Sequence, residues 1–264
     1  MLLKPFLILA LLAALPALAQ GPQSPAPASN MPAIWRHQHG PMLSADTPGS
    51  LVTVTPFWGG YAVTGTNFTK VRGSWIVPTV HCITQPDSAA ALWIGLDGYT
   101  SSTAEQIGVE FDCLGGTSTF YAWYAFLPNP VRKITSMKVS PGDKMSATVS
   151  FSGSQFTINM TNHTTGKTFS KTTGFAGAQR TSAEWIVQGY TYPMTQFNRI
   201  SFGDDYTGVN DTNWATDSSV TGPISDFGSK VVKIKMRNLD NSLRALPSAL
   251  TTDGSSFKVT WETY

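Results

Sequence analysis

Short strand-like runs separated by turn residues recur from residue 51 onward, and they constrain the fold of this chain more than any other feature. The runs are rich in β-branched and aromatic residues, and they include "GYAVTG", "GSWIVP", "ALWIGLDG", "AEQIGVEFDC", "FYAWYAFLP", "KVVKIKM" and "FKVTWETY". No segment shows the 3.6-residue apolar period of an amphipathic helix. The pattern predicts one all-β domain, an antiparallel sandwich or barrel, over residues 51–264.

The chain before this domain differs in composition and predicts an exported protein. Lys4 precedes a short apolar run, and "ALA" at residues 17–19 fits a signal-peptide cleavage site. The apolar run is too short for a transmembrane helix, which needs about 20 apolar residues. We therefore expect a signal peptide over 1–19, cleaved near Ala19, rather than an uncleaved anchor. Residues 20–50 are dominated by Pro, Ser, Ala and Gly, which predicts a disordered linker or a short propeptide.

Charge and cysteine content narrow the possible functions. Only 13% of the 264 residues are charged, and the formal net charge is +2. Because no basic block is present, nothing favours nucleic-acid binding. The even count of two cysteines in an exported chain predicts one disulfide, between Cys82 and Cys113. Two cysteines cannot form a structural zinc site, and no histidine pair lies at ligand spacing nearby, so we expect no metal.

Nucleophilic catalysis has no positive signature in the sequence. The chain lacks a G-x-S-x-G elbow, His37 and His39 lie in the tail, and His163 lies in a predicted turn. A Ser-His-Asp site stays open, because its members need not be adjacent in sequence. A thiol nucleophile is disfavoured if the two cysteines are paired, because a disulfide leaves no thiolate.

Amide and carboxylate side chains on two predicted strands are the remaining candidates. In "AEQIGVEFDC", the alternation of a strand places Gln106, Gly108 and Glu110 on one face. In "AEWIVQ", Glu184 and Gln188 share a face in the same way. The glycine leaves room for a ligand or a neighbouring backbone. Both strands can thus line one polar surface, although two faces that are merely solvated would give the same pattern.

Several blocks of the chain resemble the glutamic peptidases, also called eqolisins. The blocks are "PFWGGYAVTGTNFTKVRGSWIVP" at 56–78, "ALWIGLDG" at 91–98, "EQIGVEF" at 105–111, "YAWYAFLP" at 121–128, "VSPGDKMSATV" at 139–149, "NMTNHTTGKTFSKT" at 159–172 and "SAEWIV" at 182–187. Each block alone is a weak motif, but their joint order and rough spacing are specific. Beyond about residue 200 the resemblance is confined to strand texture.

This resemblance implies a sandwich of two antiparallel sheets with a catalytic Gln and Glu on the concave sheet. The family's Gln matches Gln106, and its Glu matches Glu184. As a carboxylate, Glu184 can take a proton from water and pass it to the leaving amine. Gln106 can donate an N–H to the developing oxyanion. Such chemistry needs no cofactor, and it implies a secreted endopeptidase that cleaves proteins or peptides at acidic pH.

Four further positions are implied to bind substrate. Trp58 lies in "FWGG", Trp93 and Asp97 lie in "LWIGLDG", and Glu110 stands where the family has an acidic neighbour of the Gln strand. Core packing would account for the tryptophans equally well. The chain departs from the family at Ala125, where members carry an acid. Many members are also strongly acidic, so the net positive charge leaves the acid optimum open.

Two rival hypotheses use the same residues. A lectin-like glycoside hydrolase would pair Glu110 with Glu184, and a carbohydrate-binding module without activity would use Trp58 and Trp93 as stacking platforms. The amide of Gln106 favours the peptidase, because a glycosidase has no need of it. For the peptidase we expect a monomer that binds neither nucleic acid nor membrane. We also predict that Glu184 and Gln106 lie on neighbouring strands and share one water.

Overall fold

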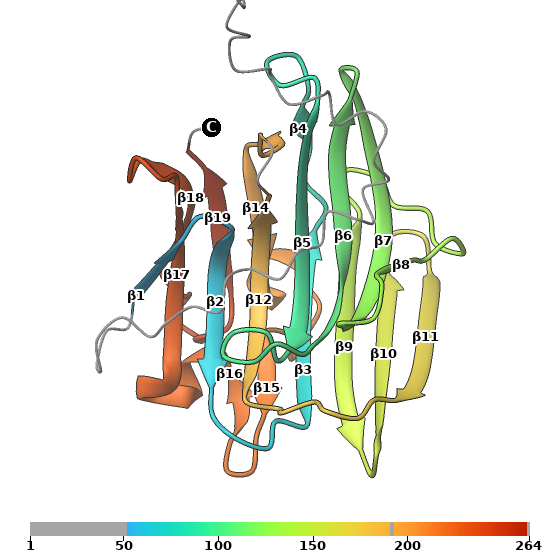
Figure 1. Cartoon of the computed structure of the whole chain (residues 1–264), viewed down its shortest axis with the longest axis vertical. Helices are drawn as coiled ribbons and strands as arrows, with labels where there is room; N and C mark the ends of the chain where they lie inside the picture. The colour runs from blue at the N-terminus through green and yellow to red at the C-terminus, as the bar shows by residue number, and fades with distance from the viewer. Residues whose placement is uncertain (1–51, 191–192, 263–264) are drawn as a thin grey trace, which may run out of the picture.

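The computed structural model describes residues 52–190 and 193–262, and strands make up nearly all of its regular structure (Figure 1). The first of two layers contains, in spatial order, β1 (Val52–Thr55), β17 (Val231–Arg237), β2 (Trp58–Thr64), β12 (Ser182–Gly189), β5 (Ser88–Leu96), β6 (Ala104–Leu114), β7 (Thr117–Leu127) and β8 (Arg132–Lys133). Among the described strands, only β1 and β17 pair in parallel.

The second layer lies behind the first in the view of Figure 1. It contains β18 (Leu243–Pro247), β19 (Phe257–Trp261), β14 (Arg199–Phe202), β3 (Lys70–Ile76), β9 (Lys144–Ser152), β10 (Gln155–Asn162) and β11 (Lys167–Gly174), with β15 (Trp214–Thr216) and β16 (Thr221–Pro223) attached along β3. The layers are joined where β17 pairs with β18 past a bulge. The predicted antiparallel β-sandwich is therefore confirmed.

The remaining elements are short. Strands β4 (Val80–His81) and β13 (Gln196–Phe197) form a separate small pair. The helix α1 (Asp204–Thr207) is a single turn, and η3 (Ile224–Lys230) is a 3-10 segment. Neither of these, nor any other helix within the described ranges, has the length and apolar character needed to cross a membrane.

The main hydrophobic core fills the space between the layers. Strand β6 contributes Ile107 and Val109 from its inner face, and β3 contributes Trp75 from the opposite layer. The indole Nε1 of Trp185 on β12 donates to the Arg72 carbonyl at 2.8 Å, which ties β12 to the second layer. The alternation of β6 and β12 therefore directs one set of residues into this core and leaves the other set on the outer face.

A second hydrophobic cluster lies on that outer face of the first layer. All of its strand residues come from the first layer: Trp58, Ala62, Ala89, Ala91, Trp93, Ala104, Tyr121, Trp123, Ala125, Leu127, Ile186 and Ile234. Since none of them faces the second layer, this cluster is distinct from the core between the layers. The candidate site lies on this face.

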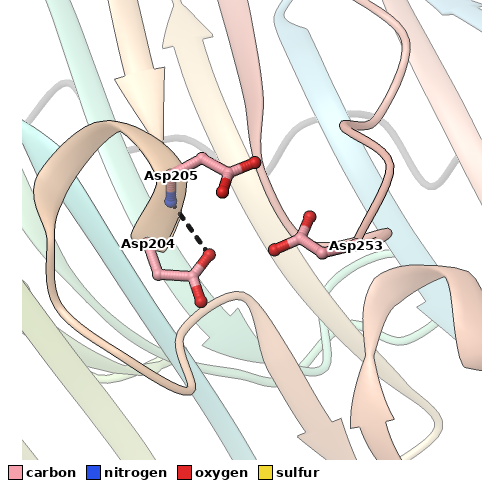
Figure 2. Close-up of side chains that lie close together, drawn as sticks. All are labelled: Asp204, Asp205 and Asp253. Carbon is pink, nitrogen blue, oxygen red and sulfur yellow. Dashed lines mark hydrogen bonds between the residues drawn. The ribbon is translucent and has the colours of Figure 1, made fainter.

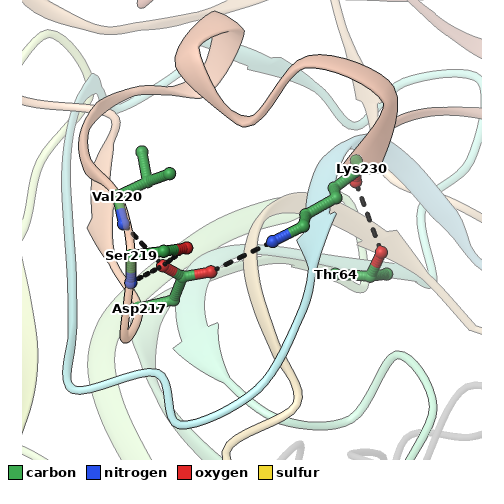
Figure 3. A network of polar contacts seen from close by, with 5 residues as sticks. All are labelled: Thr64, Asp217, Ser219, Val220 and Lys230. Carbon is green, nitrogen blue, oxygen red and sulfur yellow. Dashed lines mark hydrogen bonds and ion pairs between the residues drawn. The ribbon is translucent and has the colours of Figure 1, made fainter.

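A disulfide and an ion-paired turn fix the ends of strands. Cys82 and Cys113 are bonded, with their Cα atoms 5.4 Å apart, so the disulfide predicted from the sequence is confirmed. Figure 3 shows the turn at Asp217, whose carboxylate accepts from the Ser219 N–H at 2.7 Å and meets Lys230 Nζ at 3.4 Å. The disulfide ties the segment after β4 to β6, and the ion pair ties the turn after β15 to the end of η3.

Candidate functional site

Three strands of the first layer bring Glu184 and Gln106 to the same level of its outer face. Here a level is a row of residues that lie directly opposite one another across the strands, and successive levels on one face are two residues apart along each strand. Glu184 on β12 lies opposite Gly95 on β5, and Gly95 lies opposite Gln106 on β6. Because directly opposed residues of antiparallel strands share a face, both side chains project from the same side of the sheet. The faces predicted from sequence alternation are confirmed, since Ile186 belongs to the outer cluster and Ile107 to the inner core.

The prediction that Glu184 and Gln106 lie on neighbouring strands is wrong, because β5 separates β12 from β6. Two strand spacings put the backbones about 9–10 Å apart. The residue between them, Gly95, has no side chain, and Gln106 leans over it. A Cβ on Gly95 would lie 2.9 Å from Cγ of Gln106. The glycine therefore lets the two functional side chains approach each other across an intervening strand.

Small residues continue this level of the sheet on both sides. Ala62 on β2 lies opposite Glu184, and Ala125 on β7 lies opposite Gln106. We call Ala62, Glu184, Gly95, Gln106 and Ala125 the central row. Apart from Glu184 and Gln106, no residue of this row has a side chain larger than a methyl group. The row therefore leaves the two longer side chains flanked by small residues, although all of these residues except Gly95 have buried side chains.

The turn between β5 and β6 lies against the central row. Gly98 in this turn has a φ of 106°, which favours glycine. A Cβ on Gly98 would lie 3.5 Å from Nε2 of Gln106 and 3.7 Å from Cη2 of Trp58. The backbone N–H of the next residue, Tyr99, lies close enough to Glu184 to influence its ionisation. Backbone of this one turn thus approaches both members of the pair.

Burial controls the ionisation of Glu184. The residue is 0% exposed, and neither carboxylate oxygen has a hydrogen-bond partner of normal geometry among the described residues. Burial raises the pKa of Glu184 well above its ordinary value of 4.5, and it outweighs the opposing influence of the nearby Ser182 hydroxyl and Tyr99 N–H. The negative charge of Asp97 raises this pKa further, as does that of Glu105 when Glu105 is ionised. The pKa of Glu184 is therefore set mainly by its burial and by neighbouring charges, which makes this residue a candidate for proton transfer.

Trp58 and Trp93, which were predicted to bind substrate, lie together on the outer face. Their ring centroids are 5.1 Å apart in an edge-to-face arrangement with an interplanar angle of 79°. Trp93 Nε1 donates to Oε1 of Gln188 at 2.8 Å, and Trp93 lies opposite Ile186 and Gly108, one level away from the central row. Both rings are buried. The arrangement agrees with core packing and also with a rigid wall beside the pair.

Glu110 lies on the same face, two levels away from Gln106. It lies opposite Ala91, which in turn lies opposite Gln188. Its Oε2 accepts a hydrogen bond from the Tyr190 hydroxyl at 3.0 Å. Burial, followed by the charge of Glu110, raises the pKa of Tyr190 well above its ordinary value of 10, so this hydroxyl keeps its proton and donates it. A role for Glu110 in substrate binding stays a prediction.

The register separates Glu110 from Glu184 too widely for a glycosidase pair. Their levels on the sheet differ by four residues, which corresponds to about 13 Å along the strands, and β5 also lies between them. Paired carboxylates in glycosidases are about 5–9.5 Å apart. Glu110 and Glu184 therefore do not form the carboxyl pair on which the rival hypothesis of a glycoside hydrolase depends.

Asp97 acts as a clamp at the end of β5. Its carboxylate is 0% exposed and accepts from the backbone N–H groups of Gln179, Arg180 and Thr181 at 2.8, 2.7 and 2.8 Å. It also accepts from the Thr103 hydroxyl at 3.4 Å. These bonds hold the segment that leads into β12 against the turn after β5. The contacts show that Asp97 holds the chain just before β12, and its direct contact with substrate stays a prediction.

Two residues that shape the site were not predicted from the sequence. Gly95 lies opposite both Glu184 and Gln106, which makes it the spacer between them. Tyr190 donates a hydrogen bond to Glu110. Because strand pairing is non-local, no signal in either segment indicates these relations. Gln188 shared a predicted face with Glu184, and the structure adds its partner Trp93.

A separate group of carboxylates lies near α1, away from the central row. Asp204, Asp205 and Asp253 each offer an oxygen within 4.8 Å of the others, as Figure 2 shows. Asp204 Oδ1 accepts from the Asp205 N–H at 3.0 Å and from the Ser255 hydroxyl at 2.8 Å. These bonds fasten α1 to the turn at Asp253. The group is partly exposed, and we assign no ion to it.

Comparison with known proteins places this chain in a family. The sequence model of the Peptidase A4 family matches residues 56–243, more than half of the chain. Aspergillopepsin-2 of Aspergillus niger is 30% identical over 158 residues, which cover 50% of this chain and 55% of that protein. Scytalidopepsin B of Scytalidium lignicola is 30% identical over 142 residues, which cover 52% of this chain and 53% of that protein. The chain thus spans about half the length of the curated relatives it matches.

A solved structure agrees with the fold. Scytalido-glutamic peptidase with a transition state analog inhibitor superimposes with a TM-score of 0.64 at 21% identity, over 78% of this chain and 98% of that one. At this identity the likeness supports the sandwich architecture alone. Together with the sequence match, it confirms the resemblance to glutamic peptidases. The chain belongs to the Peptidase A4 family.

Proposed function

We propose that this protein is an endopeptidase of the glutamic type, in which Glu184 and Gln106 form the catalytic pair. The observation that carries the proposal is the central row, which places a carboxyl and a carboxamide on one face with only Gly95 between them. Its family relatives support the class of reaction. A structure similar in fold was solved with a transition state analog inhibitor, which supports a peptide as the substrate.

The proposed reaction needs only water, the pair and the peptide. Ionised Glu184 takes a proton from a water molecule while the water oxygen bonds to the scissile carbonyl carbon. The carbonyl oxygen becomes an oxyanion, and Nε2 of Gln106 donates a hydrogen bond to it. When the tetrahedral intermediate collapses, the C–N bond breaks and Glu184 returns the proton to the leaving nitrogen. The products are a carboxylic acid and an amine, and Glu184 is again a carboxylate.

The burial of Glu184 bears on the pH at which the pair would work. A general base is most effective when its pKa lies near the operating pH, and burial raises the pKa of Glu184 well above 4.5. We propose an acidic optimum, and the raised pKa argues against one at extreme acid. The rate should rise with pH as Glu184 loses its proton.

The parts of the protein outside the described strands complete the proposal. Residues 1–19 and 20–50, predicted to be a signal peptide and a linker or short propeptide, lie outside the described residues. We propose that the protein is exported to an extracellular or periplasmic space and acts there as a monomer, without nucleic acid or membrane as a partner. The disulfide supports an oxidising compartment. Because Glu184 is fully buried, the proposed reaction requires a movement that gives water and substrate access to it.

Digestion of denatured casein tests the proposed class. We expect cleavage that is strongest at mildly acidic pH and that survives inhibitors of serine, cysteine, metallo and pepsin-like peptidases, because the pair needs none of the groups these compounds attack. The measurement is acid-soluble peptide released across pH 2 to 8, with each inhibitor added separately. Loss of all cleavage with any one inhibitor would assign the activity to another class.

Substitution of the spacer tests the geometry of the pair. In Gly95→Ala, the added Cβ would lie 2.9 Å from Cγ of Gln106 and 3.0 Å from the Glu105 carbonyl oxygen, so Gln106 must shift. Because a misplacement of about 1 Å can cost about 10²-fold in rate, we expect kcat/KM for a peptide to fall by roughly 10- to 100-fold. The matched control is Gly174→Ala, whose Cβ would meet a single atom at 3.8 Å. Equal activities for the two variants would contradict the spacer role.

A further inference from the structure

Strand β6 carries a buried carboxyl, that of Glu105, which the proposed reaction does not use. Glu105 immediately precedes Gln106, is 0% exposed, and has no hydrogen-bond partner for either carboxylate oxygen among the described residues. Successive residues of a strand point to opposite faces, so Glu105 points away from the central row. It lies opposite Leu96 on β5 and Phe126 on β7. A carboxyl with apolar neighbours and no donor is costly to ionise.

The charged groups around Glu105 do not compensate for this burial. The end of β5 presents Asp97, whose negative charge opposes ionisation, and β12 presents Glu184, whose carboxyl interacts unfavourably with that of Glu105. The segment before β12 presents Arg180, the cation that favours ionisation. Its guanidinium, however, lies over the Phe151 ring, 4.3 Å from the centroid, and forms no ion pair with Glu105.

The ionisation of Glu105 reflects these surroundings. Burial, and then the charge of Asp97, raises the pKa of Glu105 from 4.5 to about 9, against the weaker influence of Arg180. The folded protein therefore keeps a proton on Glu105 that the unfolded chain releases near its ordinary value. The stability that depends on this proton is complete below about pH 4.5, and it is lost as the pH rises toward about 9.

We propose that Glu105 is a positioning residue that works as a neutral carboxylic acid: while protonated it keeps β6, and with it Gln106, in place, and when it ionises it releases that strand. The proton passes to solvent, and the carboxylate left behind has no donor and faces Asp97. It relaxes only by moving toward water, and because Gln106 is the next residue of the strand, this movement turns Gln106 out of the central row. The relevance to catalysis rests on the proposed function, whereas the effect on β6 does not.

Urea unfolding of the full-length chain between pH 4 and 10 tests the proposal. One proton bound only by the folded state changes the unfolding equilibrium constant tenfold per pH unit. In the window from about pH 4.5 to about 9, the slope for Glu105→Gln should therefore be smaller than that of wild type by about one proton. The residual slope will come partly from Glu184, whose pKa is raised as well. The matched control is Glu262→Gln, which removes an exposed carboxylate and should keep the wild-type slope.

Hydrogen exchange at pH 10 separates positioning from plain stability. At this pH we expect the ratio of the wild-type exchange rate to the Glu105→Gln exchange rate to be at least tenfold larger for amides of β6 than for amides of β10. Unchanged exchange in β6 would overturn the positioning role, and parallel unfolding slopes would overturn the neutral acid itself. Neither measurement depends on peptidase activity, so a failure of the proposed function would be distinguished from a failure of this inference.

A titration of wild type keeps the test decisive if Glu105→Gln does not fold. Glutamate carboxyl carbons labelled with ¹³C report each ionisation separately. We expect one carboxyl that titrates near pH 9 and that is absent from Glu105→Leu. If every glutamate except Glu184 titrates near its ordinary value, the proposal is wrong.

Discussion

Glu184→Gln should lower the peptidase rate by about 10²–10⁴-fold, because this is the usual contribution of a general base. The two side chains are nearly isosteric, so the change deletes the proton acceptor and leaves the packing in place. Because the Glu184 carboxyl is fully buried and its pKa is raised, we expect the variant to be at least as stable as wild type above pH 4.5. The measurements are kcat/KM on a peptide and the midpoint of thermal unfolding.

Glu110→Gln is the matched control for this variant. Glu110 lies on the same face and is fully buried too, but it is bonded to the Tyr190 hydroxyl and lies two levels from the central row. Its substitution should change activity far less than that of Glu184. If Glu184→Gln kept normal proteolysis while Glu110→Gln abolished it, the assignment of the base would be wrong.

Gln106→Ala should lower kcat by about 10²–10³-fold, the typical cost of losing one oxyanion donor. The effect should appear in kcat more than in KM, because the hydrogen bond strengthens as the oxyanion forms. Steady-state kinetics at the pH optimum measure this split. Gln155→Ala, on the exposed end of β10, is the control for removing a glutamine. A purely higher KM for Gln106→Ala would indicate that this residue only binds substrate.

Gln106→Glu distinguishes the roles of the pair further. It would place a second carboxyl beside Gly95, facing Glu184 across β5. Two carboxyls in one site tend to share a single proton. The variant should therefore be impaired, and its pH profile should shift toward higher pH. A profile identical to that of wild type would show that the two groups do not interact.

The periodicity of single strands was predictable from the sequence, whereas the order of the strands was not. Alternation alone placed Gln106 with Glu110 and Glu184 with Gln188, because side chains change face at every residue. The insertion of β12 between β2 and β5 joins segments that are distant in the chain, and no local pattern encodes such a pairing. The sequence therefore indicated the faces of Glu184 and Gln106 correctly but not the strand β5 that lies between theirs, and their role as a catalytic pair stays a proposal.

Glu105 illustrates the same limit for electrostatics. Alternation places Glu105 on the same face as Ile107. A glutamate in a strand, however, gives no sign of whether a cation lies near enough to compensate its charge. Only the positions of Asp97 and Arg180 show that its charge stays uncompensated. The disulfide was predictable because a count of two leaves a single pairing.

The small residues of the central row have a consequence for selectivity. Ala62, Gly95 and Ala125 offer methyl groups or bare backbone beside Glu184 and Gln106. Under the proposed function, this row would therefore contact the main chain of a peptide and contribute little to the recognition of its side chains. Preference for particular amino acids should then come from the neighbouring levels, where aromatic rings such as Trp93 line the face. An engineer who wishes to change which bonds are cut would leave the central row untouched and vary the rings on either side of it.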